Sequence, residues 1–306
     1  MIIETLSTFP DMYESVMGAS MMRIAQEKGI LDFEAHDLRD WTHDRHRTTD
    51  DEPYGGGDGL VMKCAPIFEA YESLCAAPCK GSGDAEQPTG QGAAAPAEQA
   101  PGEGSDPAPA AQAPCEGSDP AAAAQAPCEG SDPAAAEQAP SKPYTIFLAP
   151  QGRRFDDACA CELAKQDRLL FICGHYEGID ERAYTLADEV ISLGDYVLTS
   201  GELASMVVID AVVRKLPGVL GAETGALGES FADGLLEYPQ YTRPANFNGM
   251  EVPAVLLSGN HGAVDRWRRE QSLERTYRLR PDLLEGMELP DADRAFLQSL
   301  STEGRQ

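Results

Sequence analysis

Four segments of the sequence combine glycine with charged or hydroxyl side chains in a way that packing alone does not explain. One runs from Thr42 to Gly59 and places two histidines and two arginines in five residues ahead of a triple glycine. The others are Ala149 to Arg154, Gly174 to Asp180 and Gly194 to Glu202. Glycine lets the backbone approach a ligand closely, and backbone N–H groups can receive an anion. These segments are candidate ligand-binding loops, although a single glycine-rich loop is more often a turn beside solvated charge.

The histidines and cysteines do not have the spacing of a structural metal site. His43 and His46 are too close for an H-x3-5-H pair, and neither Cys75 with Cys79 nor Cys159 with Cys161 forms one of the two C-x-x-C pairs that zinc sites use. The eight cysteines also lack the pattern of a small secreted disulfide framework. We therefore expect reduced thiols and no dedicated metal site.

The elements that position the candidate loops alternate between strand and helix. Apolar runs predict strands at 2–7, 31–36, 144–148, 168–173 and 189–192. A helix is expected from Asp11 to Lys28, with Tyr13, Met17, Met21 and Ile24 on one face and Gly29 as its stop. Further helices are expected at 66–74, 156–165 and 202–214. This alternation predicts an α/β fold with a parallel sheet covered on both faces.

Three of the candidate loops follow neighbouring strands of that predicted sheet. Loops at the carboxyl ends of parallel strands converge on one crevice, where α/β sheets bind small molecules. None of these loops is a G-x-G-x-x-G or Walker sequence. The pattern argues against an ordinary dinucleotide or nucleoside-triphosphate enzyme and favours a differently shaped ligand.

A segment of different composition interrupts the alternating pattern. From Gly81 to Pro140 there are ten Asp or Glu residues and no Lys or Arg, and Gln-Ala-Pro recurs every 13 residues from Gln99. Solenoid repeats stack through apolar side chains, and these repeats offer only alanine. We expect an acidic, flexible insertion rather than a folded domain.

The overall charge excludes binding to nucleic acid by bulk attraction. The formal net charge is −27, and removing the ten acids of the insertion still leaves about −17. Basic clusters are local: 45–47, 153–154, 214–215, and 260–280, where six arginines face three acids for a net of +3. The sequence shows neither a membrane-length apolar run nor a basic leader, so we expect a cytoplasmic protein.

Several strings occur along the chain in this order: THDRHRT, PYGGGDG, APQGR, GHYEGIDER, GDYVLTSGE, PGVLG, SFADGLLEYPQYTRP and LLSGNH. Together they resemble the bacterial tRNA (guanine-N1)-methyltransferases of the SPOUT class. The resemblance covers essentially the whole chain outside 81–140. It implies methyl transfer from S-adenosylmethionine to N1 of the guanosine at position 37 of tRNA.

The resemblance also implies an architecture. Residues 1–220 would form an α/β domain that binds S-adenosylmethionine, with a parallel sheet, a SPOUT-type trefoil knot towards its C-terminal end and the insertion at about 81–140. Residues 221–235 would be an interdomain linker, and 236–306 a small, mainly helical domain that binds tRNA. The protein would be a homodimer with each active site at the interface.

Site residues follow from the same resemblance, position by position. The knot loops would bind S-adenosylmethionine largely through backbone atoms of Leu148, Pro150, Gly174, Tyr176, Ile191, Gly194, Tyr196, Leu198 and Gly201. Glu177 belongs to the same site and is the acid linked in the family to magnesium, whose preference for oxygen ligands suits it. No residue set forms a dedicated magnesium cage.

Methylation of guanine N1 needs two catalytic groups. N1 carries a proton at neutral pH, so a base must remove it while charge developing on O6 is stabilised. By the resemblance, Arg214 steadies O6 and Glu229 occupies the position of the family's aspartate base. Glutamate is one methylene longer, so Asp233 is the alternative base.

The sequence leaves two further functions open. A knotted protein that binds RNA without transferring a methyl group would retain the fold and lack a working base. A regulatory module that binds nucleotides through the Gly55 to Gly59 loop would prefer nucleoside triphosphates to S-adenosylmethionine.

Overall fold

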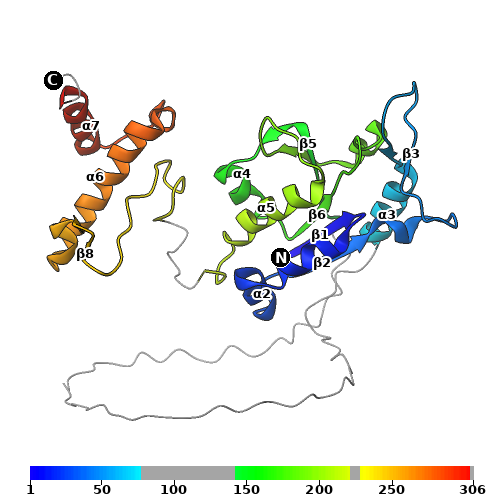
Figure 1. The fold of residues 1–306 in the computed structure, drawn as a ribbon, viewed down its shortest axis with the longest axis horizontal. Helices are drawn as coiled ribbons and strands as arrows, with labels where there is room; N and C mark the ends of the chain where they lie inside the picture. Colours follow the sequence, from blue (N-terminus) through cyan, green and yellow to red (C-terminus); the bar gives the residue numbers. More distant parts are fainter. Residues whose placement is uncertain (77–141, 221–227, 304–306) are drawn as a thin grey trace, which may run out of the picture. The chain divides into compact units, whose positions relative to one another are not determined.

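The computed structural model describes residues 1–76, 142–220 and 228–303 (Figure 1). The predicted insertion at 81–140 and the first part of the predicted linker at 221–235 lie outside the described residues. Among the helices that are described, none is long and apolar enough to cross a membrane.

The main element is a five-stranded sheet whose neighbouring strands are all parallel. It consists of β1 (Ile2–Ser7), β2 (Asp32–Asp37), β5 (Tyr144–Arg154), β6 (Arg168–Ile172) and β7 (Glu189–Ser192). The strand order is β2-β1-β6-β5-β7. The predicted α/β parallel sheet is therefore confirmed. β5 contains one of the candidate loops, β6 and β7 precede two others, and β5 lies between β6 and β7.

Side chains on the two faces of the sheet belong to two separate apolar clusters. In β6, Leu169 and Phe171 join one cluster, while Leu170 and Ile172 join the other, as expected from alternating side chains in a strand. The first cluster includes residues of α2 (Ser20–Glu27), α4 (Asp157–Leu163) and α5 (Gly201–Val213). The second includes α3 (Cys64–Ala76), η2 (Leu38–Trp41) and η3 (Glu181–Leu186). Both faces are covered, which explains why the central strand β6 is a continuous apolar run from Leu169 to Ile172.

The predicted helix from Asp11 to Lys28 is wrong as a single helix. The structure has a 3-10 turn η1 (Pro10–Tyr13), a short α1 (Glu14–Met17) and then α2. The Gly18 N–H bonds to Glu14 O, Ala19 is extended and Ser20 has a φ of +47°. This break rotates the second part, so that Met22 is buried where Met21 was expected. The stop at Gly29 is confirmed, since α2 ends just before it.

β5 also differs from its prediction, because it continues past Leu148 to Arg154. Leu148 and Arg153 both pair with Ile191 of β7, so residues 149–152 leave the ladder and return to the same position. The segment predicted to be a loop beyond the strand is therefore an excursion within it.

The remaining elements are short connections and the C-terminal helices. A two-stranded hairpin joins β3 (Asp50–Asp51) and β4 (Val61–Met62). After residue 228 come the hairpin β8 (Asn246–Phe247) and β9 (Met250–Glu251), η5 (Ala254–Leu257), α6 (His261–Leu279), η6 (Pro281–Leu284) and α7 (Asp291–Glu303). This segment is mainly helical, as its sequence predicts.

Candidate cofactor and substrate site

A cavity of about 470 Å³ lies at the carboxyl ends of β5, β6 and β7. Its walls come from three segments, 148–151, 174–184 and 191–204, as expected for loops that follow adjacent parallel strands. All ten residues proposed from the sequence to bind the cofactor line this one cavity: Leu148, Pro150, Gly174, Tyr176, Glu177, Ile191, Gly194, Tyr196, Leu198 and Gly201.

Two glycines are required because backbones meet closely beside this cavity. A Cβ at Gly152 would lie 2.6 Å from the Ile191 backbone, and a Cβ at Gly201 would lie 2.6 Å from Gly174 N. The Gly201 N–H also donates to Gly174 O at 2.7 Å. The three segments are therefore fixed to one another by main-chain contacts that leave no space for a side chain.

Tyr176 is the cavity residue with the least favourable backbone. Its φ is +59°, a conformation that costs a non-glycine residue about 1–2 kcal/mol. Burial raises the pKa of its hydroxyl, and the hydrogen bond with Thr49 opposes that rise. The hairpin side of the cavity adds support, because the Glu177 N–H donates to Leu60 O at 3.0 Å.

Several cavity residues were not singled out from the sequence. His175 and Ser200 lie inside the quoted loops, and each has a buried polar atom, Nδ1 and Oγ, without a hydrogen-bond partner among the described residues. Buried polar atoms are nearly always hydrogen-bonded, so these two atoms could bond to a ligand or to water. Ile179 also lies inside the second loop, and Tyr184 belongs to η3 just after it; neither was singled out.

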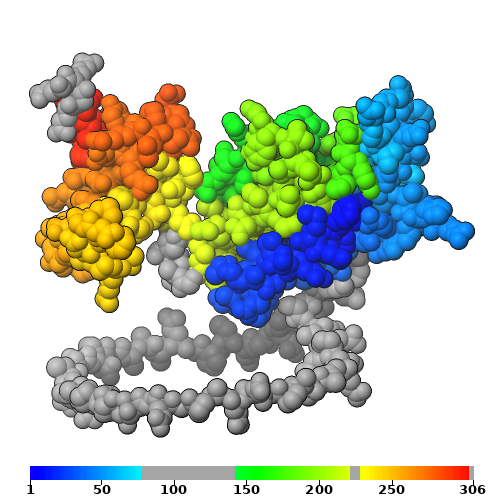
Figure 2. Space-filling view, viewed as in Figure 1, coloured from blue at the N-terminus to red at the C-terminus, as the bar shows by residue number. Residues whose placement is uncertain are grey.

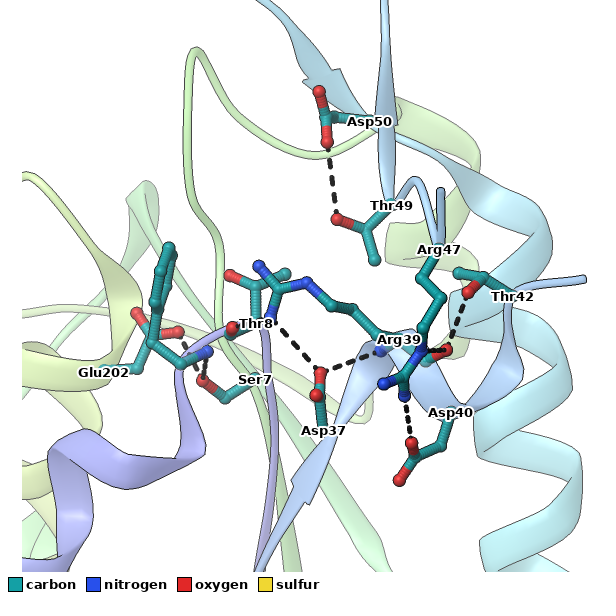
Figure 3. A network of polar contacts seen from close by, with 11 residues as sticks. Ser7, Thr8, Asp37, Arg39, Asp40, Thr42, Arg47, Thr49, Asp50 and Glu202 are labelled. Carbon is teal, nitrogen blue, oxygen red and sulfur yellow. Dashed lines mark hydrogen bonds and ion pairs between the residues drawn. The ribbon is translucent and has the colours of Figure 1, made fainter. Parts of the chain in front are cut away.

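The loop from Thr42 to Gly59 does not line the cavity, but its own contacts define its shape. Asp44 accepts from the backbone N–H groups of His46 and Thr48 and from the Thr48 hydroxyl, which lowers the pKa of the Asp44 carboxyl. Arg47 bonds to Asp40 (Figure 3). Among described residues the structure gives the Arg45 side chain no ion-pair partner, so this side chain remains available to an anion.

The catalytic candidates lie apart from the cavity lining. Arg214 at the end of α5 forms an ion pair with Glu229, so the structure brings together the two side chains expected to handle O6 and the N1 proton. Asp233 instead accepts from Arg269 Nη1 at 2.6 Å, and Arg269 also bonds to Asp293. Neither acid belongs to the cavity described above.

The donor set around Glu177 does not make a magnesium site. Across 1–76, 142–220 and 228–303, no group of three or more His, Cys, Asp or Glu side chains is arranged to hold a metal ion. We therefore assign no step of the reaction to magnesium.

The described cysteines, Cys64, Cys75, Cys159, Cys161 and Cys173, are unpaired. Burial raises the pKa of Cys159 to about 11 and that of Cys173 to about 12, so both remain protonated thiols at neutral pH. Protonated thiols are poor metal ligands. The other three cysteines lie outside the described residues.

Comparison with known proteins identifies the family. The model of the family described as tRNA (guanine-1)-methyltransferase TrmD matches residues 1–93 and 128–286. The chain belongs to this family. The model leaves 94–127, inside the acidic segment 81–140, and 287–306 unmatched. The resemblance drawn from the quoted strings is confirmed.

Relatives match over almost their whole length. Proteins called tRNA (guanine-N(1)-)-methyltransferase from Geobacter sulfurreducens and Moorella thermoacetica are each 42% identical to this chain. The first match covers 99% of both chains, and the second covers 98% of this chain and 97% of the relative. One from Carboxydothermus hydrogenoformans is 43% identical over 97% of this chain and 92% of its own.

Proposed function

We propose that this protein transfers a methyl group from S-adenosylmethionine to N1 of the guanosine at position 37 of tRNA. Membership of the TrmD family supports a tRNA (guanine-N1)-methyltransferase. The observation that carries the proposal is that the ten residues implied by the resemblance, which come from three segments, line one cavity. An enzyme acting on tRNA is expected in the cytoplasm.

The cavity suits the proposed methyl donor in size and chemistry. Its volume of about 470 Å³ is within the range of about 300–1,000 Å³ of small-molecule sites. Apolar walls such as Leu148 and Leu198 suit a purine ring, while the unpartnered Ser200 Oγ and His175 Nδ1 offer polar contacts. S-adenosylmethionine supplies the electrophilic methyl group. We assign the trefoil knot to the same three segments.

In this proposal Glu229 accepts the N1 proton and Arg214 stabilises the charge that develops on O6. As the N1–methyl bond forms and the sulfur–methyl bond breaks, Glu229 takes the N1 proton and becomes a neutral acid. Arg214 donates hydrogen bonds to O6, on which negative charge develops as the proton departs. The products are N1-methylguanosine and S-adenosylhomocysteine.

The proposed substrate would have to break the ion pair between Arg214 and Glu229 in order to bind. Glu229 and Arg214 bond to each other in this structure, and a guanine would have to insert between them, giving O6 to the arginine and N1–H to the acid. Arg214 and Glu229 would each lose one hydrogen-bond partner and gain another from the guanine, so neither charged group would be left without a partner. Glu229 pairs with the arginine proposed to stabilise O6, whereas Asp233 pairs with Arg269, and this favours Glu229 as the base.

An exposed apolar face supports the proposed homodimer. Met12, Val16, Leu203 and Val207 are between 36% and 54% exposed on η1, α1 and α5, which lie next to one another. Figure 2 shows the blue N-terminal segment and the yellow-green α5 segment on the same side of the molecule. A second copy on this face would also allow a catalytic acid of the partner to reach the cavity, whose lining holds neither Glu229 nor Asp233.

The basic helix expected to meet tRNA is partly neutralised. Of its six arginines, four form ion pairs with acids: Arg268, Arg269, Arg278 and Arg280. Within the described chain, Arg266 and Arg275 have no such partner. We assign phosphate contacts to these two rather than to the helix as a whole.

Methylation assays test the proposal directly. The protein is incubated with methyl-labelled S-adenosylmethionine and unmodified tRNA carrying guanosine at positions 36 and 37, and the product nucleoside is mapped. We expect N1-methylguanosine at position 37. Binding of S-adenosylmethionine without transfer would favour a non-catalytic RNA-binding protein, and preference for nucleoside triphosphates would favour a regulatory module.

A further inference from the structure

A buried carboxylate joins the start of α5 to the end of β1. Glu202 is fully buried, and its Oε1 accepts from the Ser7 hydroxyl at 2.5 Å (Figure 3). The same hydroxyl accepts from the Phe9 backbone N–H at 2.8 Å. The Ser7 hydroxyl thus donates to Glu202 of α5 and accepts from the Phe9 N–H. Through Ser7, the Phe9 backbone is linked to Glu202, which is 195 residues from Ser7 in sequence.

The Phe9 ring lies between two further groups. Its centroid is 4.8 Å from that of the His175 ring, and the Arg39 guanidinium carbon lies 5.4 Å from the Phe9 centroid. Arg39 also donates to Thr8 O and is held by Asp37. Phe9 is 39% exposed, so burial alone does not explain its placement. Its contacts are directional: a cation on the ring and a tilted aromatic pair.

His175 connects Phe9 to the cavity wall, because its ring contacts both Phe9 and Tyr176. Its ring meets the Tyr176 ring edge-on, with centroids 4.8 Å apart and planes at 88°. Its backbone N–H points at Met62 Sδ, 3.2 Å away. Tyr176 lines the cavity and has the unfavourable positive φ, so it depends on its neighbours to stay in place.

We infer that Phe9 is a positioning residue for the cofactor cavity. It holds His175, and through His175 it holds Tyr176 in the orientation that closes one wall. Arg39, Phe9, His175 and Tyr176 form a continuous series of contacts from η2 to the cavity, and Ser7 and Glu202 fix the Phe9 backbone. The inference rests on the proposed function for the identity of the ligand, but the series of contacts does not.

The first arm of the test measures ligand binding. Calorimetry with S-adenosylmethionine compares the parent with Phe9→Ala, Phe9→Tyr and the control Phe247→Ala, which removes an exposed ring of β8. We expect Phe9→Ala to weaken binding about tenfold, as loss of an aromatic pair predicts, and Phe9→Tyr to restore it. In the methylation assay, the KM for S-adenosylmethionine should rise while kcat changes little. Parent-like affinity in Phe9→Ala would overturn the inference.

The second arm needs no ligand. The proton NMR signals of the His175 imidazole are assigned by comparison with His175→Gln among the five histidines of the chain. The ring current of Phe9, whose centroid is 4.8 Å from that of His175, shifts these signals, so Phe9→Ala should move them and Phe247→Ala should not. Ser7→Ala, which leaves the ring in place but removes its anchor, should broaden or partly move them.

The two arms separate the two hypotheses. If the parent does not bind S-adenosylmethionine but Phe9→Ala moves the His175 signals, the proposed function fails and the positioning role survives. If the parent binds and Phe9→Ala leaves both the signals and the affinity unchanged, the positioning role is wrong.

Discussion

The proposed cofactor cavity and the proposed catalytic pair are built by different means. The cavity is held by main-chain contacts, with Gly201 against Gly174 and Gly152 against Ile191, and its position follows from three adjacent strands. Arg214 and Glu229 are held by one ion pair between half-exposed side chains. Binding geometry is thus fixed by the fold, whereas the reactive groups rest on a contact that a substrate can replace. Substitutions in the two regions should have opposite signatures.

The largest effect is expected from Glu229→Gln. Loss of the proposed base should lower kcat by about 10²–10⁴-fold. The melting temperature should barely change, since an exposed ion pair contributes about 0–1 kcal/mol. Single-turnover methylation and thermal melts measure the two quantities. Asp233→Asn is the matched control, and if that variant loses activity while Glu229→Gln retains it, the base is Asp233.

Gly201→Ala should show the opposite signature. The new Cβ would meet Gly174 N at 2.6 Å, and such overpacking typically destabilises by about 1–3 kcal/mol. Affinity for S-adenosylmethionine should fall with stability, as urea melts and calorimetry would show. Gly262→Ala is the control, because the nearest atom to its Cβ would be 3.8 Å away, and this change should leave stability unchanged or raise it slightly. Equal behaviour of both variants would contradict the role given to the main-chain contact at Gly201.

A smaller effect concerns the pH dependence of the sheet domain. Burial acts to raise the pKa of Glu4, but hydrogen bonds from His36 and Arg168 outweigh it, so the pKa lies below its ordinary 4.5. A carboxylate with a lowered folded pKa stabilises the protein above the unfolded pKa and loses that contribution as pH falls through the folded value. Urea melts below pH 4.5 should therefore show a steeper loss of stability in the parent than in Glu4→Gln. Glu27→Gln, at an exposed position, should keep the parent's slope.

The smallest effect is expected at the basic helix. Arg266→Ala should weaken tRNA binding by a few-fold and reduce the slope of log affinity against log salt by about 1. Arg278→Ala, which removes an arginine already paired with Glu274, should change both less. Filter binding across a salt series checks this, and equal slopes for the two variants would mean that the pairing is irrelevant to tRNA.

The sequence predicts the sheet better than it predicts the helices. β1 and β7 begin and end where the sequence predicts them, at Ile2–Ser7 and Glu189–Ser192. The helix predicted from Asp11 is interrupted between Gly18 and Ser20. The backbone conformation there breaks the helix, although the helical spacing of apolar residues continues through this part of the sequence. The sequence does not predict that β5 extends to Arg154, because this extension depends on pairing with β7, which is distant in sequence.

The candidate site divides in the same way. Convergence of three loops at one edge follows from the parallel sheet that the alternation of strands and helices predicts. The pairing of Glu229 with Arg214 does not, since no rule of composition or spacing connects residues 15 positions apart across a glycine-rich segment. Likewise, the series of contacts through Phe9 joins residues from several places in the chain and leaves no local signal.

The excursion in β5 has a consequence for how this cavity can change. Because Leu148 and Arg153 both pair with Ile191, the four residues between them begin and end at the same rung. Residues can be added or removed there without shifting the hydrogen-bonding register on either side, whereas a single insertion within a strand would turn every later side chain to the opposite face. One wall of the cavity can therefore be remodelled over evolutionary time while the sheet beneath it stays the same.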